Sequence, residues 1–132
     1  MVDLAENDVG EYIALKDISG RQGISVKYLE QIVRQLSNSG YLKSVRGPQG
    51  GYRLAKKPEH YTVGDILRIT EGSMAPVACL DDETNECPHY TQCPTVELWE
   101  GLYEKINDYI NGITLEDVVN KHQEKGSIDY VI

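Results

Sequence analysis

The stretch that decides the fold spans residues 23–54 and reads GISVKYLEQIVRQLSNSGYLKSVRGPQGGYRL. Ser25 is a favourable N-cap, and the apolar residues after it recur at the spacing of one face of an α-helix. Gly40 supplies a C-terminal stop. We therefore predict a helix over 26–38. Its apolar face carries Tyr28, Leu29, Ile32, Val33 and Leu36.

Two short strand candidates follow this helix, at 41–46 and 52–55. Residues 47–51 between them are rich in glycine and must turn, so the pair predicts a β-hairpin with Arg46 near its tip. A shorter helical pattern over 14–22 precedes the stretch and ends before Gly23. The order helix, turn, helix, hairpin predicts a winged helix-turn-helix.

The charge distribution supports a nucleic-acid partner. The chain has 132 residues and a net charge of −8, yet residues 16–57 hold nine basic and two acidic side chains. A basic block in an acidic chain indicates a phosphate-binding face, although a solvated charged surface has the same pattern. The sequence contains no apolar run that could span a bilayer and no signal-peptide pattern, so we expect a cytoplasmic protein.

The exposed face of the 26–38 helix is suited to the major groove of DNA. Glu30 can accept a hydrogen bond from cytosine, and Gln31 can pair with adenine. An arginine on a glycine-rich wing suits a narrow minor groove. The alternative is a simple i,i+4 pair between Glu30 and Arg34 on a solvated helix. The predicted DNA-binding residues are Ser25, Lys27, Tyr28, Glu30, Gln31, Arg34, Arg46, Gly47, Pro48, Gln49, Gly50 and Gly51.

Three cysteines, Cys79, Cys87 and Cys93, lie within one loop at the spacing C-x7-C-x5-C. Clustered thiols in a cytosolic protein are typical of zinc or iron–sulfur binding. Three unliganded cysteines remain an alternative, as does a structural zinc site completed by His89. Acidic neighbours argue against a catalytic thiol, so we do not expect an enzyme.

The C-terminal half is predicted to be mainly helical. A capping box at Thr62 opens a helix over 63–70. A long helix over 95–111 carries an apolar stripe, which we interpret as a dimerisation surface. A last short helix and a tail at 127–132 complete the chain. The predicted divisions are a DNA-binding domain at 1–70, a cysteine loop at 71–94 and a dimerisation segment at 95–132. The stripe consists of Leu98, Leu102, Ile106, Tyr109 and Ile110.

The motifs YLEQ (28–31) and RGPxGGY (46–52) resemble the Rrf-two family of bacterial winged-helix regulators, which includes IscR-, CymR- and NsrR-like proteins. The resemblance continues through the three cysteines and the segment 113–115. It implies a mainly α fold with a small two-stranded wing and a long dimerisation helix. It also implies a homodimeric repressor that binds a pseudo-palindromic DNA operator. A [2Fe–2S] cluster held by Cys79, Cys87 and Cys93 would sense iron–sulfur, redox or nitric oxide status.

Three features depart from the IscR-like pattern. Val96 stands where IscR-like proteins place a histidine, which leaves the fourth ligand open among Glu97, His89, water and a partner residue. The sequence starts partway into the first helix, without the basic segment that relatives carry there. The tail at 130–132 is more similar to CymR-like members, several of which bind no cluster and respond to a partner enzyme of cysteine synthesis.

Overall fold

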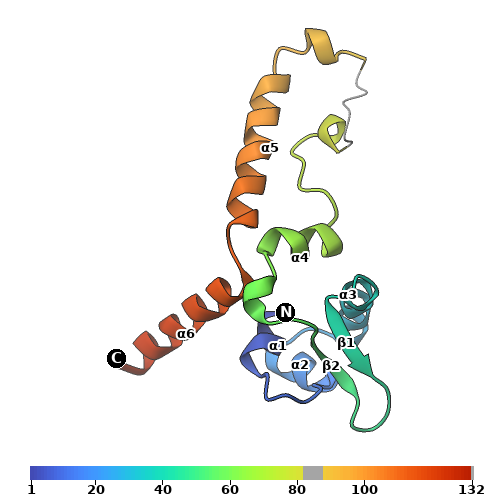
Figure 1. Cartoon of the computed structure of the whole chain (residues 1–132), viewed down its shortest axis with the longest axis vertical. Helices are drawn as coiled ribbons and strands as arrows, with labels where there is room; N and C mark the ends of the chain where they lie inside the picture. The colour runs from blue at the N-terminus through green and yellow to red at the C-terminus, as the bar shows by residue number, and fades with distance from the viewer. Residues whose placement is uncertain (82–87, 132) are drawn as a thin grey trace.

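The computed structural model describes the backbone of residues 1–81 and 88–131, and the side chains of residues 1–81 and 88–126. It is mainly helical with one two-stranded antiparallel sheet, as predicted (Figure 1). None of the described helices is long and apolar enough to cross a membrane. The helices are α1 (Val2–Glu6), α2 (Leu15–Gln22), α3 (Val26–Asn38), α4 (Val63–Thr70), α5 (Val96–Asn111) and α6 (Leu115–Val131).

The helix-turn-helix forms as the sequence indicates. Helix α2 ends at Gly23, whose positive φ of 65° gives the sharp left-handed turn that glycine makes without steric cost. Ser25 then caps α3, because its side chain accepts a hydrogen bond from the backbone N–H of Tyr28 at 3.2 Å. The wing consists of β1 (Leu42–Val45) and β2 (Gly51–Leu54), with Leu42 opposite Leu54.

A third segment pairs with the wing, which the sequence analysis did not foresee. Ile13 and Tyr52 exchange two backbone hydrogen bonds, of 2.9 and 2.8 Å. A Cβ atom at Gly51 would lie 2.2 Å from the carbonyl oxygen of Ile13, so only glycine permits this approach. The wing is therefore anchored to the segment that leads into α2.

The core lies between the helix-turn-helix, the wing and the start of α6. Tyr61 is completely buried in it; its hydroxyl donates to the carbonyl of Tyr41 at 2.6 Å and accepts from the backbone N–H groups of Ala55 and Lys56. The core includes Leu115 and Val119, which come from the far end of the chain. Its other members are Leu4, Ile18, Leu29, Val33, Leu36, Leu42 and Leu54.

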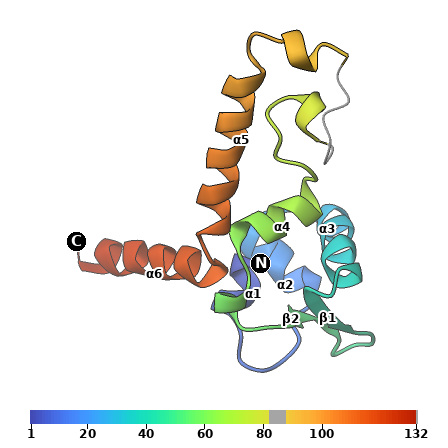
Figure 2. The ribbon, with the colours of Figure 1, turned by 45° about the horizontal axis from the view of Figure 1, so that its top comes forward.

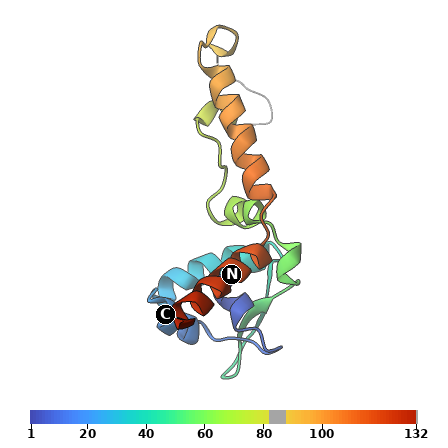
Figure 3. The ribbon, with the colours of Figure 1, turned by 90° about the vertical axis from the view of Figure 1, so that its left-hand side faces the viewer.

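Helix α5 stands away from this core on the side opposite the wing, and residues 71–81 rise beside it (Figures 1 and 3). Helix α6 projects sideways from the base of α5 (Figure 2). It also packs against α1, where Glu6 pairs with His122. The prediction of a short last helix and a tail from 127 was wrong, because α6 continues to Val131. A single internal glycine costs a helix only about 1 kcal/mol, so Gly126 does not end it.

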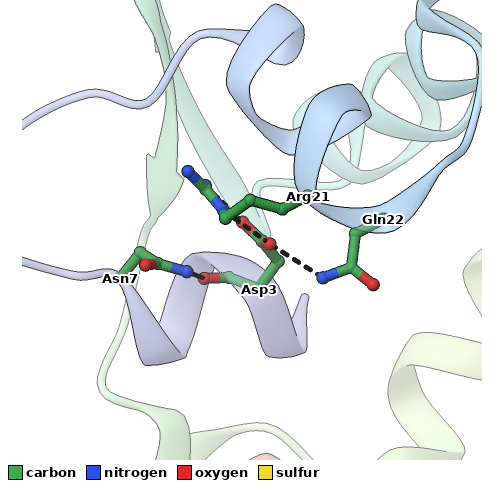
Figure 4. A network of polar contacts seen from close by, with 4 residues as sticks. All are labelled: Asp3, Asn7, Arg21 and Gln22. Carbon is green, nitrogen blue, oxygen red and sulfur yellow. Dashed lines mark hydrogen bonds and ion pairs between the residues drawn. The ribbon is translucent and has the colours of Figure 1, made fainter.

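An ion pair holds α1 against α2 (Figure 4). The carboxylate of Asp3, only 7% exposed, accepts two hydrogen bonds from Arg21, at 2.7 and 3.0 Å, and one from Gln22 at 2.9 Å. The hydrogen bond from Arg21 is the main reason that the pKa of Asp3 lies below its ordinary value. The buried charge is thus paired and hydrogen-bonded, which offsets its desolvation.

We predict that Asp3→Asn destabilises the fold by about 1–3 kcal/mol at pH 7, because Arg21 and Gln22 lose a charged acceptor. Since the pKa of Asp3 is lowered in the folded state, its contribution is full above the unfolded value of about 3.9 and is lost as the pH falls through the folded value. Urea unfolding at pH 7 and below pH 4 should show the difference shrinking in acid. Glu11→Gln, at an exposed carboxylate, is the control, and a difference independent of pH would contradict the prediction.

Candidate nucleic-acid interface and cysteine loop

The predicted recognition face of α3 is exposed. Leu29, Val33 and Leu36 point into the core and leave the polar residues outside. In the described part of the chain, neither Glu30 nor Arg34 takes part in an ion pair, so the expected alternative of an i,i+4 pair does not form there. The exposed predicted residues of α3 and its cap are Ser25, Lys27, Tyr28, Glu30, Gln31 and Arg34.

A groove separates α3 from the wing, and it brings the two predicted DNA-binding elements together. Glu30 and Arg34 line it from the helix, and Arg46 and Gly47 line it from the wing. The turn is closed by a hydrogen bond from the Gly50 N–H to the Gly47 carbonyl at 3.0 Å. Arg46, Gly47, Pro48 and Gln49 are exposed around this turn. A cationic groove beside a protruding hairpin has the form of a phosphate-binding surface.

Two wing glycines, Gly50 and Gly51, have a steric role in the turn. Gly50 and Gly51 are half-buried. A Cβ at Gly50 would lie 2.1 Å from the Val45 carbonyl oxygen, just as a Cβ at Gly51 would strike Ile13. They permit the tight hairpin that presents Arg46.

Three members of the basic block make contacts with other residues of the same chain. Arg21 binds Asp3. Arg53 donates to the carbonyl of Gly10 at 3.0 Å and lies over the ring of Tyr12. Lys56 lies over the rings of Tyr41 and Tyr61, with its Nζ 4.9 and 5.3 Å from their centres. The sequence analysis included these cations in the predicted DNA-binding face. The aromatic residues nearby were the only sequence feature that indicated their intramolecular contacts.

The cysteine loop is described at its two ends. Cys79 lies on the 3-10 turn Ala78–Leu80, and Cys93 follows the turn Tyr90–Gln92; both are half-exposed and free of disulfides. Cys87 lies outside the described residues. The hydroxyl of Tyr90 donates to Glu100 at 3.0 Å, which ties the end of the loop to α5.

The surroundings of Cys93 favour the thiolate. The side chain of Thr95 lies 3.6 Å from the sulfur, and its hydrogen bond is the main reason that the pKa of Cys93 is lowered. The backbone N–H groups of Thr95 and Val96, at the start of α5, act in the same direction. Thiolates are the form in which cysteine binds metals. The surroundings of Cys93 therefore fit a ligand of an iron–sulfur cluster or of zinc. Thr95 does not cap α5 with its side chain.

Among the residues that the structure describes, no three His, Cys, Asp or Glu side chains gather as a metal site. His89 is exposed at the start of the 3-10 turn before Cys93. Its role as a fourth ligand stays a prediction.

The predicted apolar stripe of α5 lies open. Leu98, Leu102 and Tyr109 are 64%, 42% and 69% exposed, whereas Ile106 and Ile110 are half-buried. No residue of α5 is fully buried. Large apolar side chains grouped on one helix in this way are typical of an interaction surface.

The comparisons with known proteins agree with this geometry. The profile of the Rrf2 family, described as an iron-dependent transcriptional regulator, matches residues 1–121. The chain belongs to the Rrf2 family. This is the family that the motifs resembled under the name Rrf-two, and its members here are transcriptional regulators and not enzymes, as expected.

One Rrf2 relative is an HTH-type transcriptional regulator of Haemophilus influenzae, 42% identical over 95% of this chain and 82% of its own. The solved structure of T. potens IscR is 37% identical, with a TM-score of 0.73 over 94% of this chain and 80% of that one. The structure of CymR, the global cysteine regulator of B. subtilis, is 35% identical, with a TM-score of 0.71 over 91% and 87%. The winged-helix fold and the DNA-binding class are thereby confirmed.

We predict that Thr95→Val slows the alkylation of Cys93 at pH 7 in metal-free protein, because losing the hydroxyl raises the pKa of the thiol and lowers the thiolate fraction. The measurement is the iodoacetamide rate in a Cys79→Ser, Cys87→Ser background, where Cys93 is the only thiol. Thr95→Ser keeps the hydroxyl and should react like the parent. Equal rates for all three proteins would contradict the assignment.

Proposed function

We propose that this Rrf2 protein is a repressor that binds a pseudo-palindromic operator as a homodimer, with one α3 helix in each half-site. The observation that carries the proposal is the groove shared by α3 and the wing, in which Arg34 and Arg46 face the same opening. Paired helix-turn-helix units read half-sites about one DNA turn apart, roughly 34 Å.

The DNA contact that we propose for each side chain follows from its chemistry. Glu30 and Gln31 read base edges in the major groove, as acceptor for cytosine N4 and as bidentate partner for adenine. Arg34 binds phosphate, and Arg46 enters the adjoining minor groove. Ser25, Lys27, Tyr28 and the turn 47–51 contact the backbone around them.

The proposed dimer forms through the α5 stripe, Leu98, Leu102, Ile106, Tyr109 and Ile110. The exposure of Leu98, Leu102 and Tyr109 supports it, because a second α5 would remove these side chains from water. If the two α5 helices pair antiparallel, one reading head, which consists of the helix-turn-helix, the wing and α4, lies at each end of the pair.

We further propose that Cys79, Cys87 and Cys93 hold a [2Fe–2S] cluster. The thiolate-favouring surroundings of Cys93 and the similarity to IscR support this assignment. Such a cluster supplies sensitivity to oxidants, nitric oxide and iron supply. The loop begins where α4 ends and finishes where α5 begins, so a change in its shape acts on both helices.

The similarity to CymR supports a second candidate, a cluster-free repressor of cysteine metabolism that a partner enzyme controls. In that case the three thiols are dispensable for DNA binding. A structural zinc site is the third case, in which DNA binding is indifferent to the redox state.

The DNA assignment predicts different effects for different side chains. On an operator selected from random DNA by the protein itself, Gln31→Ala should cost about 1–3 kcal/mol and relax the preference at one base position. Arg34→Ala and Arg46→Ala should weaken binding and lower the salt slope by about 1 each. Fluorescence anisotropy at several salt concentrations measures both quantities. Lys121→Ala, at an exposed cation on α6, is the control. Unchanged binding by all the groove variants would reject the interface.

The cluster assignment predicts a coloured protein when it is purified without oxygen, with about two iron and two sulfide per subunit. Cys93→Ser should remove both colour and iron. Colourless protein with about one zinc per subunit would favour the structural site. Colourless, metal-free protein whose triple Cys→Ser variant binds the operator normally would favour the CymR-like candidate.

A further inference from the structure

A single guanidinium joins the reading head to the base of α5. Arg68, on α4, donates from Nη2 to the side-chain oxygen of Asn111 at 2.6 Å and to that of Asn107 at 3.2 Å. The two asparagines are four residues apart on α5, so they lie on one face of its last turn. Arg68 therefore holds α5 through hydrogen bonds to two residues one helical turn apart.

The sequence of α4 is adapted to this contact. A Cβ at Gly64 would lie 2.2 Å from the side-chain oxygen of Asn111, and Gly64 is buried there. Glycine inside a helix costs about 0.5–1 kcal/mol relative to alanine, yet only glycine leaves room for Asn111 to reach Arg68. Asp65 lies 3.7 Å from Arg68 Nη1 while it accepts the backbone N–H of Thr62 in the capping box. The start of α4 and the position of Arg68 are thus coupled.

A second attachment lies just beyond the end of α5. The backbone N–H of Val63 donates to Ile113 at 2.8 Å, and that of Leu115 donates to Tyr61 at 2.9 Å. These bonds fix the point at which the chain leaves α5, but they leave the direction of the helix free. In the described part of the chain, α4 is the only element with which α5 makes more than marginal contact. The Arg68 contact belongs to this α4–α5 interface, and its two hydrogen bonds oppose rotation of α5 about its base.

We infer that Arg68 and Asn111 set the half-site spacing that the dimer accepts. The inference rests on the proposed function, because α5 must join two reading heads. Helix α5 has 16 residues, so it is about 24 Å long. A rotation of about 10° at its base moves the far end by about 4 Å, close to the rise of one base pair, about 3.4 Å. A rotation of α5 by this amount thus changes the distance between the two recognition helices by about one base pair.

The test compares operators whose central spacer is the selected length or is longer or shorter by one base pair. The wild-type dimer should prefer the selected length by about tenfold, about 1.4 kcal/mol. Arg68→Lys keeps the charge but loses the planar guanidinium, which places Nη2 on both asparagines while Nη1 lies near Asp65, so the preference should fall to about twofold. Asn111→Ala should do the same, and the double variant should be no worse than either single one, because the two act as a unit.

Two further measurements separate this role from general damage. Affinity for DNA with a single half-site should stay unchanged, since the α3 groove does not include Arg68. Dimer mass and unfolding midpoint should stay close to wild type, because Arg68 is 38% exposed. Lys105→Ala, at an exposed cation of α5, is the matched control and should keep the tenfold preference.

The two possible failures are distinguishable. If folded, dimeric Arg68→Lys and Asn111→Ala proteins keep the wild-type spacer preference, the role of Arg68 is overturned and the proposed function stands. If the wild-type protein itself is monomeric or shows no spacer preference, the dimeric operator reading fails, and the spacing role is overturned with it.

Discussion

The buried Tyr61 connects the base of the wing to the start of α6. The hydroxyl of Tyr61 satisfies backbone groups of Tyr41, Ala55 and Lys56, at the base of the wing. Its own carbonyl accepts the N–H of Leu115, at the start of α6. Because an unpaired backbone group in a core costs about 1–3 kcal/mol, these bonds make the wing, α4 and α6 one unit. The position of Arg46 relative to α5 depends on this junction.

Rigid support ends at the base of α5. The reading head has a common core from Leu4 to Val119, whereas α5 has no fully buried residue. The helix that is proposed to join two subunits is therefore held mainly through α4, in a contact that includes the hydrogen bonds from Arg68. Polar contacts at the surface are individually weak, so a modest change in the adjoining cysteine loop is enough to compete with them. This weakness is compatible with the proposed cluster, whose loss would need to shift an equilibrium by only a few kcal/mol.

The basic block serves two purposes. Arg21, Arg53 and Lys56 stabilise the head through an ion pair, a backbone carbonyl and aromatic rings. Arg34 and Arg46 remain in the groove between α3 and the wing. Because the chain as a whole carries a net charge of −8, only the local excess of positive charge on this face favours DNA. Arg34 and Arg46 are the cations of the groove that we propose contacts DNA.

The sequence by itself determined the local elements. The Ser25 cap, the Gly23 turn, the period of α3 and the capping box at Thr62 depend on interactions within a few residues, and each formed as predicted. The motifs around the wing were sufficient to indicate the Rrf2 family. The end of α6 was predicted wrongly, because one glycine is too weak a signal to stop a helix.

Only the tertiary structure decided which polar residues are structural and which are free. Asp3 meets Arg21 across 18 positions, Arg53 meets Gly10 across 43, and Arg68 meets Asn111 across 43. No periodicity in the sequence encodes such contacts, since they exist only after the core has brought distant segments together. The angle of α5 belongs to the same class, because it depends on the room left by Gly64 and on one guanidinium that spans two helices.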